Sequence, residues 1–115
     1  MLTNPQSHRW VTLIRENLST SHLVMSCSRD EFIDSPTLQL AGEALAIRVG
    51  DLAKKIMMHE PPLGDQKIWQ SAARTRDFLA HHYHQIDIDI LWETVTVSFA
   101  GLTLAREALT DGEPS

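Results

Sequence analysis

Several kinds of residue are scarce in this chain of 115 residues, and each scarcity excludes a class of protein. The single cysteine, Cys27, cannot form an internal disulfide bond, so the sequence gives no sign of an oxidising compartment. No uninterrupted apolar run approaches the roughly 18 residues of a membrane span. The first ten residues also lack the apolar core of a secretory signal. We therefore expect a soluble, cytoplasmic protein that has no membrane partner.

Positive charge is scarce as well. Ten Lys and Arg residues stand against 15 Asp and Glu residues, which gives a net charge of −5. Proteins that bind nucleic acid without sequence preference are usually basic, because they must neutralise many phosphates. The charge balance therefore speaks against a broad phosphate-binding surface, while a small, local cationic site remains compatible with it.

The composition that remains is typical of a folded helical domain. Hydrophobic residues make up 43% of the chain and charged residues 22%, with only five glycines and five prolines. Asn4 followed by Pro5 predicts the start of a first helix, which we expect to fade near Cys27. Ser35 followed by Pro36 predicts the start of a second helix. A short helical turn is expected between these two, within residues 28–35.

Apolar residues at spacings of three and four continue the second helix as far as the proline-rich loop around residues 61–64. Gly50 interrupts this helix at a cost of ~1 kcal/mol relative to alanine, and it favours a close approach of another helix. A third helix is expected over about residues 66–83, and Asp87 predicts the start of a fourth. The sequence thus predicts an all-α, up-and-down bundle of four main helices over residues 1–110, followed by a tail at residues 111–115.

The stretch RTRDFLAHHYH, residues 74–84, concentrates polar side chains on the third helix. Asp77 and His81 are four residues apart and therefore neighbours on a helix, where a carboxylate can orient an imidazole and raise its pKa. Arg76 and Tyr83, seven apart, share one face. Arg76 and His81 are roughly 140° apart around the helix, so they form only half of a pocket. A second helix, from within the chain or from a partner subunit, must supply the rest.

An arginine and a histidine together suit phosphate chemistry. Histidine exchanges a proton near neutral pH. Arginine holds phosphate oxygens with two parallel donors and stabilises the charge that grows on them. RNA carries its own nucleophile, the 2′-hydroxyl, so its cleavage needs no metal. The pair is compatible with RNA cleavage without singling it out.

Simpler interpretations of the same residues stay open. The three histidines His81, His82 and His84 suit the C-terminal end of a helix, where the helix dipole favours positive charge. Tyr83 suits a half-buried anchor, and Arg74 an ordinary solvated residue.

A metal site is a further alternative. It would use His81, His84, Asp87 and Asp89, but this set crosses a predicted helix break and has no standard zinc spacing.

The stretch RDFLAHHY, residues 76–83, also matches a known pattern: an arginine, four residues, a histidine, one residue and a tyrosine. With its flanks it resembles the HepT-like toxins of the HEPN superfamily. The flanks are VGDLAKK at residues 49–55, a tryptophan (Trp69) after the proline-rich loop, and IDIDILWETV at residues 86–95. The resemblance covers roughly residues 32–109, about two thirds of the chain.

This resemblance implies a HEPN-like bundle and a metal-independent endoribonuclease without a cofactor. It implies a homodimer in which two copies of the motif face one cleft. Arg76 and His81 would be the catalytic pair, with Asp77 and Asp51 in support. The products would be a cyclic or 3′-phosphate end and a free 5′-hydroxyl. Arg74, His82 and His84 are candidates for contacts with RNA.

The resemblance also implies a partner. Tyr83 matches the tyrosine that a minimal nucleotidyltransferase antitoxin modifies with AMP, which makes the chain the toxin of a type VII-like toxin–antitoxin system. A bulky anionic nucleotide beside the cleft would block RNA and oppose its charge. Two positions depart from the family pattern: His82 replaces a small or polar residue, and Asp51 replaces a glutamate. The alternative is a non-catalytic helical dimer that acts as binding partner or antitoxin of a nucleotidyltransferase.

Overall fold

The computed structural model describes residue 2 and residues 4–24, 26–81 and 87–110, without the side chains of Val24, Asp65, His81 and Thr110. Within these residues every regular element is helical, which confirms the predicted all-α class. Four main helices stand out, as expected, and a short helix and a 3-10 turn connect them. The elements are α1 (Pro5–Val24), α2 (Arg29–Asp34), α3 (Pro36–His59), η1 (Pro61–Asp65), α4 (Lys67–His81), α5 (Ile88–Glu93), η2 (Thr94–Ser98) and α6 (Phe99–Thr110).

Side-chain caps begin the helices where the sequence predicts them. The Asn4 Oδ1 accepts a hydrogen bond from the Gln6 N–H at 2.8 Å, and the Ser35 Oγ accepts one from the Leu38 N–H at 3.2 Å. Asp87 caps α5 by accepting from two backbone N–H groups. The helical turn expected between the first two helices is α2.

The predicted helix ends are less accurate than the starts. The first helix ends at Val24, three residues before the expected Cys27. The described part of α4 runs from Lys67 to His81, and the last two residues predicted for it, His82 and Tyr83, lie outside the described residues. The predicted tail, residues 111–115, also lies outside them.

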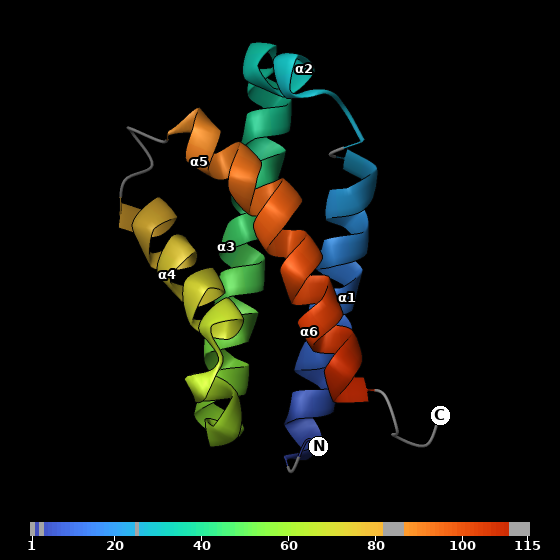
Figure 1. The fold of residues 1–115 in the computed structure, drawn as a ribbon, viewed down its shortest axis with the longest axis vertical. Helices are drawn as coiled ribbons and strands as arrows, with labels where there is room; N and C mark the ends of the chain where they lie inside the picture. Colours follow the sequence, from blue (N-terminus) through green and yellow to red (C-terminus); the bar gives the residue numbers. More distant parts are fainter. Residues whose placement is uncertain (1, 3, 25, 82–86, 111–115) are drawn as a thin grey trace.

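The core forms around α3, which Figure 1 shows between α1 and α4, with the helix formed by α5, η2 and α6 crossing in front. Helix α3 packs against both α1 and α4. Its buried seam meets large side chains from the surrounding elements, and Trp69 and Phe32 are fully buried. This arrangement places α3 and α4 side by side and antiparallel.

The β-prone segment TVTVS, residues 94–98, stays helical by forming a π-helical turn, η2. Two threonine hydroxyls donate to carbonyls one turn earlier: Thr94 to Ile90 at 2.8 Å and Thr96 to Trp92 at 2.7 Å. Such bonds satisfy the hydroxyls of β-branched residues inside a helix. The chain therefore continues from α5 into α6 as one helix.

This last helix, Ile88–Leu109, is long and apolar enough to cross a membrane by length and composition alone, with a mean hydropathy of 1.3 over its most apolar window. The sequence shows no uninterrupted apolar run here, because Asp89, Glu93, Arg106 and Glu107 divide it. In the structure the helix packs against α1, α3 and α4 as part of the bundle.

Candidate functional site

A glycine brings α3 and α4 into direct backbone contact beside the motif. A Cβ atom added at Gly50 would lie 2.2 Å from the Cβ of Arg76 and 2.7 Å from the carbonyl oxygen of Ala72. Neither distance is tolerable, so only glycine permits this crossing. The close helix approach expected from Gly50 is confirmed, and the helix that approaches is the one that carries Arg76.

Arg76 lies between two carboxylates that come from different helices. Its Nε is 2.6 Å from the Oδ1 of Asp51 on α3, and its Nη1 donates to the Oδ1 of Asp77 on α4 at 3.2 Å. The side chain of Arg76 is only 29% exposed. The hydrogen bond to Asp77, followed by the charge of Asp51, raises the pKa of Arg76 above its ordinary value. The guanidinium is thus a permanent cation held in a fixed place.

Lys54 completes this arrangement from α3. Its Nζ donates to the same Oδ1 of Asp77 at 2.8 Å. The bond from Lys54 is the largest cause that holds the pKa of Asp77 below its ordinary value; burial opposes it, and the bond from Arg76 adds to it. Asp51, Lys54, Arg76 and Asp77 therefore form a chain of alternating charges, which we call the Arg76 cluster.

Among the described residues, two members of the Arg76 cluster come from a second helix. Helix α3 of the same chain supplies Asp51, which the sequence analysis expected to support the site, and Lys54, which it did not name. The spacing in the sequence could have indicated Lys54: it follows Asp51 by three residues and so lies on the same side of the helix. The neighbouring Lys55 made this signal ambiguous, since sequence alone does not say which lysine faces α4.

The other motif residues are described only in part. His81 is the last residue of α4, and its side chain is outside the described residues, as are His82, Tyr83 and His84 entirely. Their predicted roles stay predictions. Arg74 donates to the Oε1 of Gln70 at 3.3 Å, which is an ordinary surface contact along α4.

The alternative metal set also stays a prediction, because two of its four members, His81 and His84, are not described. Its two aspartates have other contacts. Asp87 caps α5, and Asp89 forms an ion pair with Arg29 of α2.

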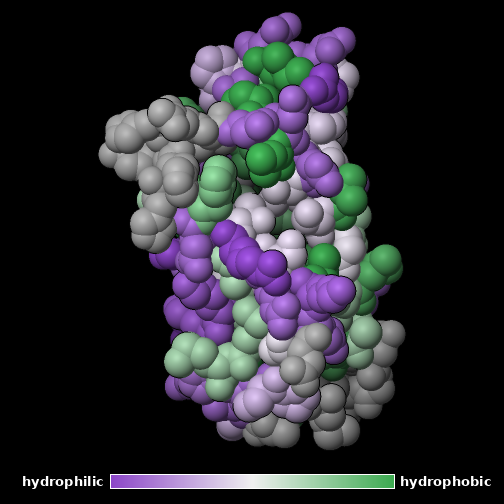
Figure 2. Space-filling model, turned by 60° about the vertical axis from the view of Figure 1, so that its left-hand side comes forward, coloured by the Kyte–Doolittle hydropathy of each residue, from purple (hydrophilic) through white to green (hydrophobic). Residues whose placement is uncertain are grey.

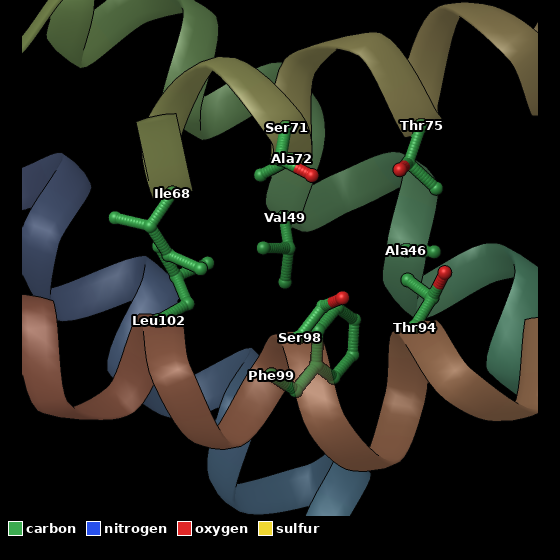
Figure 3. A pocket seen from close by; sticks show the side chains of 10 residues that line it. All are labelled: Ala46, Val49, Ile68, Ser71, Ala72, Thr75, Thr94, Ser98, Phe99 and Leu102. Carbon is green, nitrogen blue, oxygen red and sulfur yellow. The ribbon is translucent and has the colours of Figure 1, made fainter. Parts of the chain in front are cut away.

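A small, partly open pocket lies on another side of α4, where it faces the last helix. Figure 3 shows Ser71 and Thr75 of α4 opposite Thr94 and Ser98, with Val49 behind them. The pocket measures about 10 Å³. Such a space holds at most one water molecule, so a nucleotide cannot enter it.

The Arg76 cluster, in contrast, is open to solvent. The side chains of Lys54, Asp51 and Asp77 are 43–46% exposed. Arginine carries five N–H donors, so the contacts to two carboxylates leave further donors for a third anion. A phosphate group can therefore approach Arg76 from solvent, and this makes the cluster the better candidate for a site that handles a large substrate.

Comparison with known proteins identifies the family of this chain. A family model described as Ribonuclease HepT-like matches residues 14–109. A protein of Thermococcus cleftensis, named probable ribonuclease HepT, is 35% identical over 69 residues, which are 60% of this chain and 62% of the relative. The matched stretch thus spans less than two thirds of that relative's length, and no solved structure matches. Because the family match runs from α1 to α6 and contains the whole Arg76 cluster, the chain belongs to the HepT-like ribonuclease family.

Proposed function

We propose that this protein is a metal-independent endoribonuclease and the toxin of a type VII-like toxin–antitoxin system. The observation that carries the proposal is the Arg76 side chain, which two carboxylates hold in place, which is 29% exposed, and which lies on the helix that ends at His81. The family match adds RNA as the substrate class. A phosphodiester offers Arg76 the anionic oxygens that its remaining donors fit.

The proposed reaction is a transfer within the RNA. The 2′-hydroxyl loses its proton and its oxygen bonds to the neighbouring phosphorus, while the bond from phosphorus to the 5′-oxygen breaks and that oxygen takes up a proton. His81 serves these proton transfers, and Arg76 stabilises the extra negative charge on the phosphate oxygens. The products are a cyclic phosphate, which hydrolyses to a 3′-phosphate, and a free 5′-hydroxyl.

The proposal includes a homodimer in which two copies of the motif face one cleft. Exposed apolar side chains near the end of α4 support it: Ile33, Leu40, Phe78 and Ile90 come from α2, α3, α4 and α5. The C-terminal end of α4 points toward the end of the molecule where α2 and α5 lie in Figure 1. Figure 2 shows hydrophobic residues gathered at that upper end of a largely hydrophilic face. A second copy would cover them and bring the two motifs together.

The proposal also includes control by a partner in the cytoplasm. A minimal nucleotidyltransferase would attach AMP to Tyr83, which follows His81 by two residues in the sequence. The added phosphate would compete for the donors of Arg76, and the nucleotide would obstruct RNA. Mass spectrometry of the Tyr83 peptide after co-expression with such a partner measures this modification.

Cleavage of end-labelled single-stranded and folded RNAs in the presence of a chelator tests the activity. We expect Arg76→Ala to lower the rate about 10²–10³-fold, and His81→Ala about 10²–10⁴-fold. Replacing the 2′-hydroxyl at the cut site by hydrogen should abolish cleavage there. Arg9→Ala, which removes an exposed arginine of α1, serves as the charge-matched control and should cleave as the wild type does.

Full activity in both motif variants, or loss of cleavage on chelation alone, would contradict the proposal. A metal-dependent hydrolase would instead show stoichiometric zinc binding that His84→Ala removes.

A second candidate is a non-catalytic dimer that binds a nucleotidyltransferase, or acts as its antitoxin. The net charge of −5 favours it, and so does the pairing of Arg76 and Lys54 with carboxylates. This candidate expects a stable complex and no cleavage of any RNA. Expressing each partner alone and recording growth separates the two, because only the toxin arrests growth by itself.

A further inference from the structure

We infer that Lys54 is a positioning residue of the site, which acts through Asp77 to keep the Arg76 guanidinium available for a phosphate. This inference rests on the proposed ribonuclease function. It adds a residue that lies outside the RDFLAHHY motif, on a different helix from it. The observation behind it is a single carboxylate oxygen that two cations share.

The two bonds to the Asp77 Oδ1 differ in what they hold together. The bond from Arg76 at 3.2 Å joins two consecutive residues of α4, so it says little about where Asp77 lies relative to α3. The bond from Lys54 at 2.8 Å is shorter and crosses from α3 to α4. Among the contacts of the described residues, Lys54 thus holds the Asp77 carboxylate against α3.

The position of Asp77 controls the donors of Arg76. Carboxylates and guanidinium groups favour bidentate pairing, in which two parallel N–H donors serve one carboxylate. While Lys54 draws the shared oxygen toward α3, Arg76 reaches it with Nη1 alone, at the longer distance. Without Lys54, we expect Asp77 to turn fully onto the guanidinium and occupy donors that a phosphate would need.

Lys54 also sets the charge of the site. With it, the Arg76 cluster holds two positive and two negative side chains and is neutral. Without it, one cation faces two carboxylates, and the cluster becomes an anion that repels RNA. Both effects predict that loss of Lys54 impairs cleavage although the catalytic pair is intact.

The chain offers a matched control in the next residue. Lys55 has the same charge and lies on the same helix, but it is exposed, and no ion pair with another described residue involves it. Lys54→Gln and Lys55→Gln therefore change the net charge equally, and only the first removes a described contact to Asp77. Lys54→Arg keeps a cation at the position and serves as the conservative variant.

The first test combines these variants with Asp77→Asn in a double-mutant cycle on RNA cleavage. Coupled residues in one network show interaction energies that correspond to roughly 2- to 150-fold effects. We expect a loss of that size for Lys54→Gln in the wild type and no further loss in the Asp77→Asn background. Lys55→Gln should be neutral in both, and Lys54→Arg should restore most of the rate. Equal losses in both backgrounds, or no loss at all, would overturn the inference.

The second test needs no activity, so it distinguishes failure of this inference from failure of the proposed function. Carbon-13 NMR follows the titration of the Asp77 carboxyl. Because the bond from Lys54 is the largest cause of its lowered pKa, Lys54→Gln should raise that pKa, and Lys55→Gln should not. An unchanged titration in Lys54→Gln overturns the role of Lys54 even if RNA is cleaved. A clear rise in the pKa of Asp77 in Lys54→Gln supports the contact between Lys54 and Asp77 even if no RNA substrate is cleaved.

Discussion

At the scale of one residue, the charge of Asp77 affects the stability of the folded protein. Lys54 and Arg76 both donate to its Oδ1, and Asp51 lies on the other side of Arg76. The pKa of Asp77 is therefore lower in the folded protein than its ordinary value of 3.8. A carboxylate whose pKa is lowered by folding stabilises the folded state above its unfolded pKa, and this stabilisation is lost as the pH falls through the folded pKa.

We expect Asp77→Asn to lower the free energy of unfolding most above about pH 4, with the difference from the wild type shrinking as the pH falls below that value. Urea unfolding between pH 7 and pH 2 measures both curves. Asp34→Asn removes an exposed carboxylate outside the cluster and is the control. Identical behaviour of the two variants would show that the Asp77 pairs do not stabilise the fold.

At this scale, residue spacing alone indicates only those contacts of Asp77 that lie close along the chain. It placed Asp77 beside His81, four residues away, and the resemblance indicated Asp51. The sequence did not indicate a role for Lys54, because that role depends on which of two adjacent lysines faces α4. That choice is set by the rotation of α3 in the bundle and by its crossing with α4, neither of which is encoded locally.

The crossing of α3 and α4 is the element-scale feature that the site depends on. Alanine is normally the better helix former by ~1 kcal/mol, so Gly50→Ala would stabilise an isolated helix. In the bundle, the new methyl group would meet the Ala72 carbonyl at 2.7 Å and the base of Arg76. A backbone oxygen cannot move aside as a flexible side chain does, so the two helices must separate.

We expect Gly50→Ala to lower the free energy of unfolding by about 1–3 kcal/mol, as overpacking does, and to slow cleavage by displacing Arg76. Chemical denaturation and the RNA assay measure the two effects. Gly64→Ala is the control, because a Cβ there meets nothing within 4 Å. If Gly50→Ala were as stable and active as Gly64→Ala, the close crossing would not be needed for the site.

Element starts were predictable because their causes are local. Asn4, Ser35 and Asp87 each cap a helix within three residues of themselves, and a sequence shows such patterns directly. The β-prone residues 94–98 illustrate the limit: the sequence indicated a helix there, but not the π-helical turn that it forms. That turn lies where the last helix packs over α3 and α4, so it reflects tertiary packing more than local preference.

At the scale of the whole molecule, the face of α3 that contributes to the Arg76 cluster also carries an exposed leucine, Leu40. Leu40 precedes Asp51 by 11 residues, which places the two within ~20° of each other around the helix. Leu40 is 67% exposed, and together with the exposed apolar residues of α2, α4 and α5 it forms the surface assigned above to a second copy. If the dimer forms there, each Arg76 lies near the partner, and cleavage depends on association.

We therefore expect Leu40→Glu to weaken the dimer at least about tenfold, a change of roughly 1.4 kcal/mol, because it buries a charge in an apolar contact. Sedimentation velocity across a concentration series measures the association, and the RNA assay should show a matching loss at low concentration. Leu104→Glu is the matched control: Leu104 is 68% exposed but lies on α6, away from the end of α4 (Figure 1). A wild-type monomer, or equal dissociation of both variants, would show that this surface does not hold the dimer. Dissociation of Leu40→Glu with cleavage unchanged would instead show that each chain carries a complete site, built from α3 and α4 alone.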